Sequence, residues 1–87
     1  MTEIVRTRGA RERFRMDPQK LGDLRLMKGL TQAELGRKAG ISNISISMYE
    51  RGARRRPHPQ TTRKLAKALG VGVPDILIRE EADEDVS

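Results

Sequence analysis

The 87-residue sequence has no cysteine, no tryptophan and a single histidine. Without cysteine, neither a disulfide nor a thiolate metal site can brace the fold. His58 stands between two prolines and has no second histidine with which to complete a metal site. The central serines lack a neighbouring base that would make one of them a nucleophile. We therefore expect no metal, no cofactor and no enzymatic activity.

Aromatic residues and long apolar runs are equally scarce. Phe14 and Tyr49 are the only aromatic residues, too few for the stacking platforms of single-strand nucleic-acid binders. No apolar run approaches the roughly 20 residues that a membrane-spanning helix needs, and the arginine-rich N-terminus lacks the apolar stretch of a secretion signal. These absences predict a soluble cytoplasmic protein with no membrane partner.

Positive charge is abundant. The net charge is +6 although five of the twelve acidic residues fall within the last eight positions, so the preceding chain is more basic still. A polyanion is the natural partner, and the lack of stacking aromatics favours double-stranded DNA over single strands. The arginines gather before residue 16 and again after Gly52, at Arg6, Arg8, Arg11, Arg13 and Arg15, and at Arg54, Arg55 and Arg56.

Two short helices joined by a glycine turn are predicted in the middle of the chain. Thr31 and Glu34 have the spacing of a capping box, which places a helix start at Thr31. Gly40 can supply the positive φ that ends this helix. Ser42 is then the N-cap of the next one. A short helix, a tight turn and a second helix form the layout of a DNA-binding helix-turn-helix.

The second of these helices has two unlike faces. Ile46 and Tyr49 are three positions apart and point inward. The remaining side chains are mostly small and polar and lie on the open side; they are Asn43, Ile44, Ser47, Met48 and Arg51. Such a face is typical of a helix that hydrogen-bonds to a partner, and the alternative is the solvated face of an ordinary helical bundle.

Start and stop signals predict three further helices. Asp17 and Pro18 open a first helix that runs to about Lys28. A fourth helix spans about 60–69, and a short last helix carries residues 76–78. The resulting divisions are a basic flexible arm at 1–16, a helical domain at 17–79 and a disordered acidic tail at 80–87. Within the arm, residues 13–15 alternate in a way that can also form a short edge strand.

An ordered set of motifs resembles the Xre, or lambda-repressor-like, family of bacterial and phage transcription regulators. The resemblance covers roughly 17–79 and implies an all-α, compact five-helix DNA-binding domain with the helix-turn-helix at helices 2 and 3. The sequence departs from the family pattern at three places. Gly36 replaces the more frequent alanine at a cost of about 1 kcal/mol of helix propensity, and Thr62 stands where an apolar residue is common. The loop from Gly52 to Pro57 is one residue longer than the usual spacing. The motifs are GLTQAEL (29–35), AGIS (39–42), ISMYERG (46–52), Pro57 and KLAKALGV (64–71).

The resemblance also implies roles for individual residues. Helix 3 enters the major groove, and Gln32 braces Asn43. Arg25 and Glu50 form a structural ion pair. For the three loop arginines the alternative is a solubilising role. For the N-terminal arm two readings stay open, a contact to the minor groove or the DNA backbone and disorder without specific contact. Expected base contacts are Asn43, Ile44, Ser47 and Met48; expected phosphate contacts are Gln32, Ser42, Ser45, Arg51, Arg54, Arg55 and Arg56.

We expect a sequence-specific DNA-binding transcription regulator at the bacterial nucleoid, acting as a repressor and binding an inverted-repeat operator as a homodimer. Ile76, Leu77 and Ile78 on the last helix are the expected dimer seam, with closure of the monomer core as the alternative. The alternative function is an antitoxin or adaptor of the same fold, in which the last helix or the acidic tail binds a protein partner.

Overall fold

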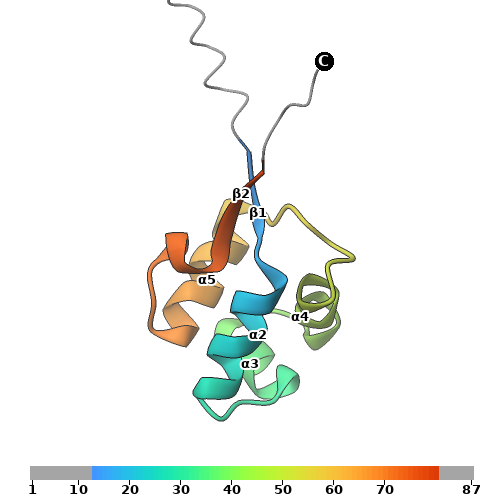
Figure 1. Ribbon diagram of the computed structural model, residues 1–87. Coiled ribbons are helices and arrows are strands. Elements are labelled where there is room, and N and C mark those ends of the chain that lie inside the picture. The colour runs from blue at the N-terminus through green and yellow to red at the C-terminus, as the bar shows by residue number, and fades with distance from the viewer. Residues whose placement is uncertain (1–12, 81–87) are drawn as a thin grey trace, which may run out of the picture.

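The computed structural model describes residues 13–80 (Figure 1). Most of the arm expected at 1–16 and most of the acidic tail expected at 80–87 lie outside the described residues. None of the described helices is long and apolar enough to cross a membrane. In chain order the elements are β1 (Arg13–Met16), α2 (Pro18–Met27), α3 (Gln32–Ala39), α4 (Asn43–Glu50), α5 (Pro59–Leu69), the 3-10 helix η2 (Val73–Ile76) and β2 (Leu77–Glu80).

The predicted all-α class and the predicted fifth α-helix are both wrong. The last segment makes a single 3-10 turn and then extends as β2, which pairs antiparallel with β1 from Met16 opposite Leu77 to Arg13 opposite Glu80. The β-branched Ile78 suits a strand once a partner is available. That partner is β1, where the alternating residues 13–15 predicted a possible edge strand. The paired strands β1 and β2 are called the hairpin below, although α2 to η2 lie between them in the sequence. Figure 1 shows the hairpin at one end of the four α-helices.

The helix starts follow the sequence signals. The Asp17 side chain accepts from the Lys20 amide at 3.2 Å. In the capping box, the Glu34 amide donates to Thr31 Oγ1 at 3.0 Å and the Thr31 amide donates to Glu34 Oε1 at 2.8 Å. Hydrogen bonding from the Thr31 amide, with that from the Thr31 side chain, holds the pKa of the Glu34 carboxyl below its ordinary value. Each cap satisfies amides that the first turn leaves without a helical partner, which fixes where α2 and α3 begin.

The core draws on β1, α2, α3, α4, α5 and η2. Thr62 is also buried, and its hydroxyl donates to the His58 carbonyl at 3.3 Å, so a polar residue is accommodated where an apolar one is common. Ile76 is fully buried and closes the core of its own chain, so it cannot lie in an exposed dimer seam as predicted. The largest fully buried side chains are Met16, Leu21, Leu35, Ile46, Leu65, Leu69 and Ile76.

A nearly buried ion pair joins the first helix to the end of the helix-turn-helix, as predicted. Arg25 Nε donates to Glu50 Oε2 at 2.6 Å and a second guanidinium nitrogen donates to Oε1 at 2.9 Å. The third nitrogen donates to the Leu30 carbonyl at 2.8 Å, and Gln32 Nε2 donates to Glu50 Oε1 at 3.1 Å. The hydrogen bonds to Glu50 raise the pKa of Arg25. One network therefore fixes α2, the α2–α3 loop, α3 and α4 relative to one another.

We predict that Glu50→Ala lowers the free energy of unfolding by about 3 kcal/mol, because it leaves the Arg25 charge without a partner in a site that is 13% exposed. Replacing both partners by apolar residues, as Arg25→Met with Glu50→Leu, should cost less than the single change. Urea denaturation followed by circular dichroism measures both. The control is Asp23→Ala, at an exposed position of α2, the helix that carries Arg25. An equal loss in Glu50→Ala and Asp23→Ala would contradict the prediction.

Candidate nucleic-acid interface

The turn between α3 and α4 packs directly on the preceding helix. Gly40 has a φ of 74°, and its amide and that of Ile41 donate to the Gly36 carbonyl at 2.8 and 2.9 Å. A Cβ at Gly36 would lie 2.5 Å from the Ile41 carbonyl oxygen, closer than real Cβ atoms approach. The space that Gly36 leaves is thus filled by the turn backbone itself, which sets α4 at a fixed angle to α3.

The two faces of α4 are those predicted. Ile46 is fully buried and Tyr49 is 4% exposed, so both belong to the core. Asn43 and Arg51 are exposed, and Ile44 is 68% exposed although it is a large apolar residue. Ser47 and Met48 lie at the edge of this open face and are partly buried. An isolated apolar side chain flanked by small polar ones can contact a base edge and its methyl group.

The start of α4 gathers hydroxyl groups and one guanidinium. Ser42 is the N-cap and its Oγ accepts from the Ser45 amide at 3.2 Å, while the Ser42 hydroxyl donates to Ser45 Oγ at 3.0 Å. Arg54 reaches back from the loop after α4 and donates to Ser45 Oγ at 3.2 Å. Its guanidinium carbon lies 5.8 Å from the centre of the Tyr49 ring. Hydrogen-bond donors therefore converge beside the open face of α4.

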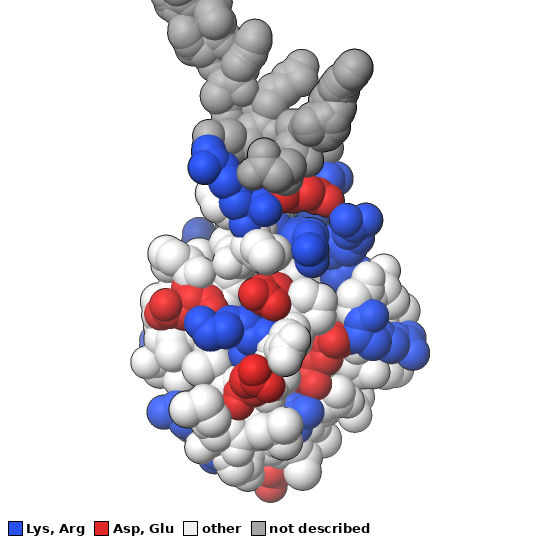
Figure 2. Space-filling view, in the orientation of Figure 1, with Lys and Arg blue, Asp and Glu red and all other residues white. Residues whose placement is uncertain are grey.

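The other two loop arginines face away from Arg54 and toward the hairpin. One nitrogen of Arg55 lies 2.8 Å from Glu80 Oε2, and one nitrogen of Arg56 lies 2.7 Å from Glu80 Oε1. The hydrogen bond from Arg56, with the charges of Arg55 and Arg15, holds the pKa of Glu80 below its ordinary value. Figure 2 shows basic side chains gathered at the hairpin end of the domain with acidic atoms between them. Glu80 is therefore a partner of the basic loop and not the start of a solvated tail.

The predicted brace from Gln32 to Asn43 is wrong, because the Gln32 amide group is drawn instead to Glu50. A charged acceptor makes a stronger hydrogen bond than the neutral Asn43 side chain offers. Gln32 stays partly exposed at the first turn of α3, so its contact to phosphate stays a prediction.

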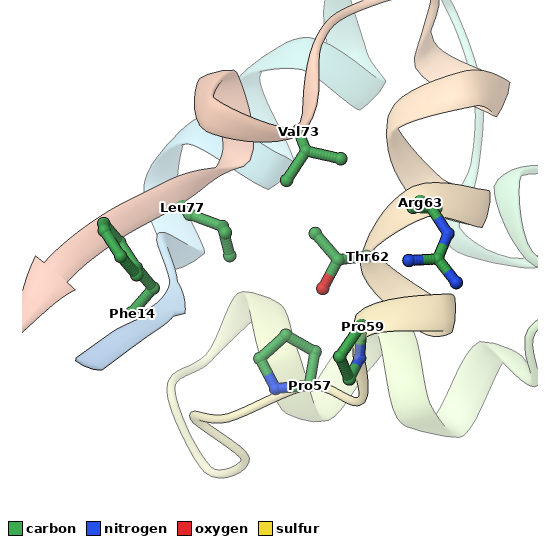
Figure 3. A pocket seen from close by; sticks show the side chains of 7 residues that line it. All are labelled: Phe14, Pro57, Pro59, Thr62, Arg63, Val73 and Leu77. Carbon is green, nitrogen blue, oxygen red and sulfur yellow. The ribbon is translucent and has the colours of Figure 1, made fainter. Parts of the chain in front are cut away.

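An apolar groove of about 390 Å³ lies between the hairpin and α5 (Figure 3). Phe14, one of the two aromatic residues, forms one wall and is 50% exposed. Sequence reasoning missed this groove because it depends on the pairing of β1 with β2; the available signal was an aromatic residue placed between arginines. The groove is lined by Phe14, Pro57, Pro59, Thr62, Arg63, Val73 and Leu77.

The family model described as helix-turn-helix matches residues 21–76, which span the turn and both helices that carry the open face. The chain belongs to the Xre, or lambda-repressor-like, family of helix-turn-helix transcription regulators. A similar protein is the uncharacterized HTH-type transcriptional regulator RghRB of Bacillus subtilis (strain 168), with 39% identity over 59 residues. The match covers 68% of this chain and 42% of RghRB, so the chain spans less than half of that relative.

Solved structures of helix-turn-helix proteins share the fold. SinR, a master regulator for biofilm formation solved in complex with DNA, is 32% identical with a TM-score of 0.65, covering 68% of this chain and 94% of SinR. The P22 c2 repressor, solved with a synthetic operator, is 29% identical with a TM-score of 0.62, covering 67% of this chain and 86% of the repressor. The chain thus shares the helix-turn-helix fold of two proteins that were solved with DNA or with an operator.

We predict that the two faces of α4 separate stability from binding. Ile44→Ala should change the free energy of unfolding by less than about 0.5 kcal/mol because the side chain is exposed. Ile46→Ala, two positions along, should cost about 2–5 kcal/mol because it leaves a cavity in the core. Thermal unfolding followed by circular dichroism measures both. Equal losses would show that the open face of α4 packs against protein.

Proposed function

We propose that this helix-turn-helix regulator is a sequence-specific repressor that binds an inverted-repeat operator in double-stranded DNA as a homodimer. The observation that carries the proposal is the open face of α4, where exposed polar side chains lie beside the Ser42, Ser45 and Arg54 cluster. Solved relatives in complex with DNA support it.

Base contacts would come from the open face of α4. The helix has eight residues and is therefore about 12 Å long, a length that the major groove accommodates. The Asn43 amide can bond an adenine edge with both its donor and its acceptor. Ser47 can bond to a base donor or acceptor, and Ile44 can contact a thymine methyl group, with Met48 adding apolar contact at the edge of the face.

Phosphate contacts would flank the reading face. The two hydroxyls at the start of α4 and the free amides of its first turn attract an anion, and the Arg54 guanidinium lies next to them. Arg51 is exposed just past the end of α4, and Gln32 lies at the first turn of α3. Such contacts fix the register of the helix on the duplex without reading its sequence.

Two copies are needed because one short recognition helix covers too few base pairs to select a single site in a genome. Of the residues expected in the dimer seam, Leu77 lines the apolar groove. Ile78 is 39% exposed, but as the next residue of β2 it points to the opposite face of the sheet. We propose the hairpin face with this groove as the seam. Repression would then follow from occupancy of the operator by the bound dimer.

The same groove favours a second candidate function, the binding of a protein partner by an antitoxin or adaptor. Its lining is mainly apolar, as in the centre of protein–protein interfaces. Sedimentation of the purified protein discriminates between the two occupants. A self-associated dimer supports a second copy in the groove, whereas a monomer that binds DNA singly leaves the groove for a different protein.

Selection of bound duplexes from a random pool tests the proposed function. We expect an inverted repeat whose half-site centres lie about 10–10.5 base pairs apart, or a multiple of that, because both helices must meet one side of the duplex. On the selected site, log affinity should fall against log salt with a slope on the order of −5, as for half a dozen neutralised phosphates. A slope near zero would exclude DNA binding, and one monomer on an asymmetric site would exclude the dimer.

Base readout by Asn43 gives a separate prediction. Asn43→Ala should cost about 1–3 kcal/mol on the selected site and relax the preference at one position in each half-site. Affinity for unrelated duplex should hardly change, because phosphate contacts dominate there. Fluorescence anisotropy with both duplexes measures this, and Gln19→Ala, which removes an exposed amide from α2, is the control. The same loss on both duplexes would assign Asn43 to a backbone contact.

A further inference from the structure

The loop between α4 and α5 is fixed to the hairpin by its backbone. The Met16 amide donates to the Arg55 carbonyl at 2.7 Å, which holds the loop against β1. From this attachment the three arginines diverge: Arg54 turns toward Ser45 on α4, while Arg55 and Arg56 turn toward Glu80 on β2. The basic loop is therefore divided into two charge groups with different partners.

Glu80 is placed to accept both guanidinium groups. It ends β2 opposite Arg13 of β1, and each of its carboxylate oxygens accepts from one arginine. The Glu80 side chain is only 19% exposed, whereas those of Arg55 and Arg56 are 59% and 53% exposed. The two arginines therefore cover the carboxylate and turn their remaining surface outward. A pair of guanidinium groups that share two anionic oxygens is also the arrangement that binds a phosphate.

We propose that Glu80 is an internal substitute for DNA phosphate: it holds Arg55 and Arg56 in the free protein and competes with the duplex for their positive charge. The inference rests on the proposed DNA-binding function and adds a regulatory residue to it. Ion pairs between exposed arginines and a carboxylate are weak, so a duplex with its dense row of phosphates can compete for both cations.

The proposed competition acts on every duplex alike. Phosphate contacts carry no sequence information, so Glu80 lowers affinity for all DNA and leaves the ratio between the operator and unrelated duplex unchanged. This separates its role from that of Asn43, which is proposed to change the ratio. The equal effect on every duplex also distinguishes the role of Glu80 from that of a residue that merely shapes the fold.

The test is Glu80→Gln, which removes the charge and keeps the size of the side chain, measured by anisotropy with a duplex of arbitrary sequence. With one or two more phosphates neutralised, the slope of log affinity against log salt should steepen by about 1 to 2. The Glu80→Gln variant should therefore bind more tightly than the wild-type protein at low salt. This advantage should shrink up to roughly tenfold as salt rises from about 50 to 200 mM. Asp23→Asn makes the same charge change at an exposed position on α2 and should leave the slope unchanged.

The arginines themselves complete the test. In an Arg55→Ala, Arg56→Ala background, Glu80→Gln should no longer steepen the slope. If Glu80→Gln weakens the hairpin by circular dichroism, Glu80→Thr removes the same charge with a residue that favours strands. Three results would each overturn the inference. Glu80→Gln could have the same slope as Asp23→Asn, its gain in affinity could persist in the Arg55→Ala, Arg56→Ala background, or a folded Glu80 variant could bind DNA more weakly than the wild-type protein. A wild-type protein that binds no duplex would overturn the proposed function as well.

Discussion

The Arg25–Glu50 ion pair is the contact on which the geometry of the open face depends. Glu50 is the last residue of α4, and its carboxylate is shared between α2 and α3 through Arg25 and Gln32. The pair is nearly buried, and the third guanidinium nitrogen is satisfied by the Leu30 carbonyl. Because breaking such a pair leaves a charge without a partner, the end of α4 has one favourable position, and the side of α4 that faces outward is fixed with it.

The start of α4 is fixed by different means. There the backbone of the Gly40 turn lies against Gly36, with no room for a side chain between them. A sterically fixed start and an electrostatically fixed end together leave only the outward side chains of an eight-residue helix free to vary. That separation lets the sequence of the open face change without loss of the fold, which is what a DNA-binding element needs in order to acquire different specificities.

The features predicted correctly from sequence are those specified within a few residues. The caps at Asp17, Thr31 and Ser42 depend on neighbours three positions away, and the two faces of α4 follow from a helical period within one helix. The hairpin pairs residues 13–16 with residues 77–80, and no local signal specifies that meeting. Pro74 in the first turn of η2 suits an α-helix and a 3-10 turn alike. The chain therefore looked helical where it becomes a strand.

The same non-local pairing changes the meaning of the charges. By sequence, Glu80 belongs to an acidic run and the three loop arginines form one patch; in the fold, Glu80 forms ion pairs with Arg55 and Arg56 and leaves Arg54 with α4. Three adjacent cations repel one another when no anion is present. A carboxylate among them relieves that repulsion in the free protein, and by the same Coulombic attraction it opposes their transfer to a phosphate. In the proposed complex, a residue that stabilises the basic loop in the free state therefore weakens the binding of DNA to that loop.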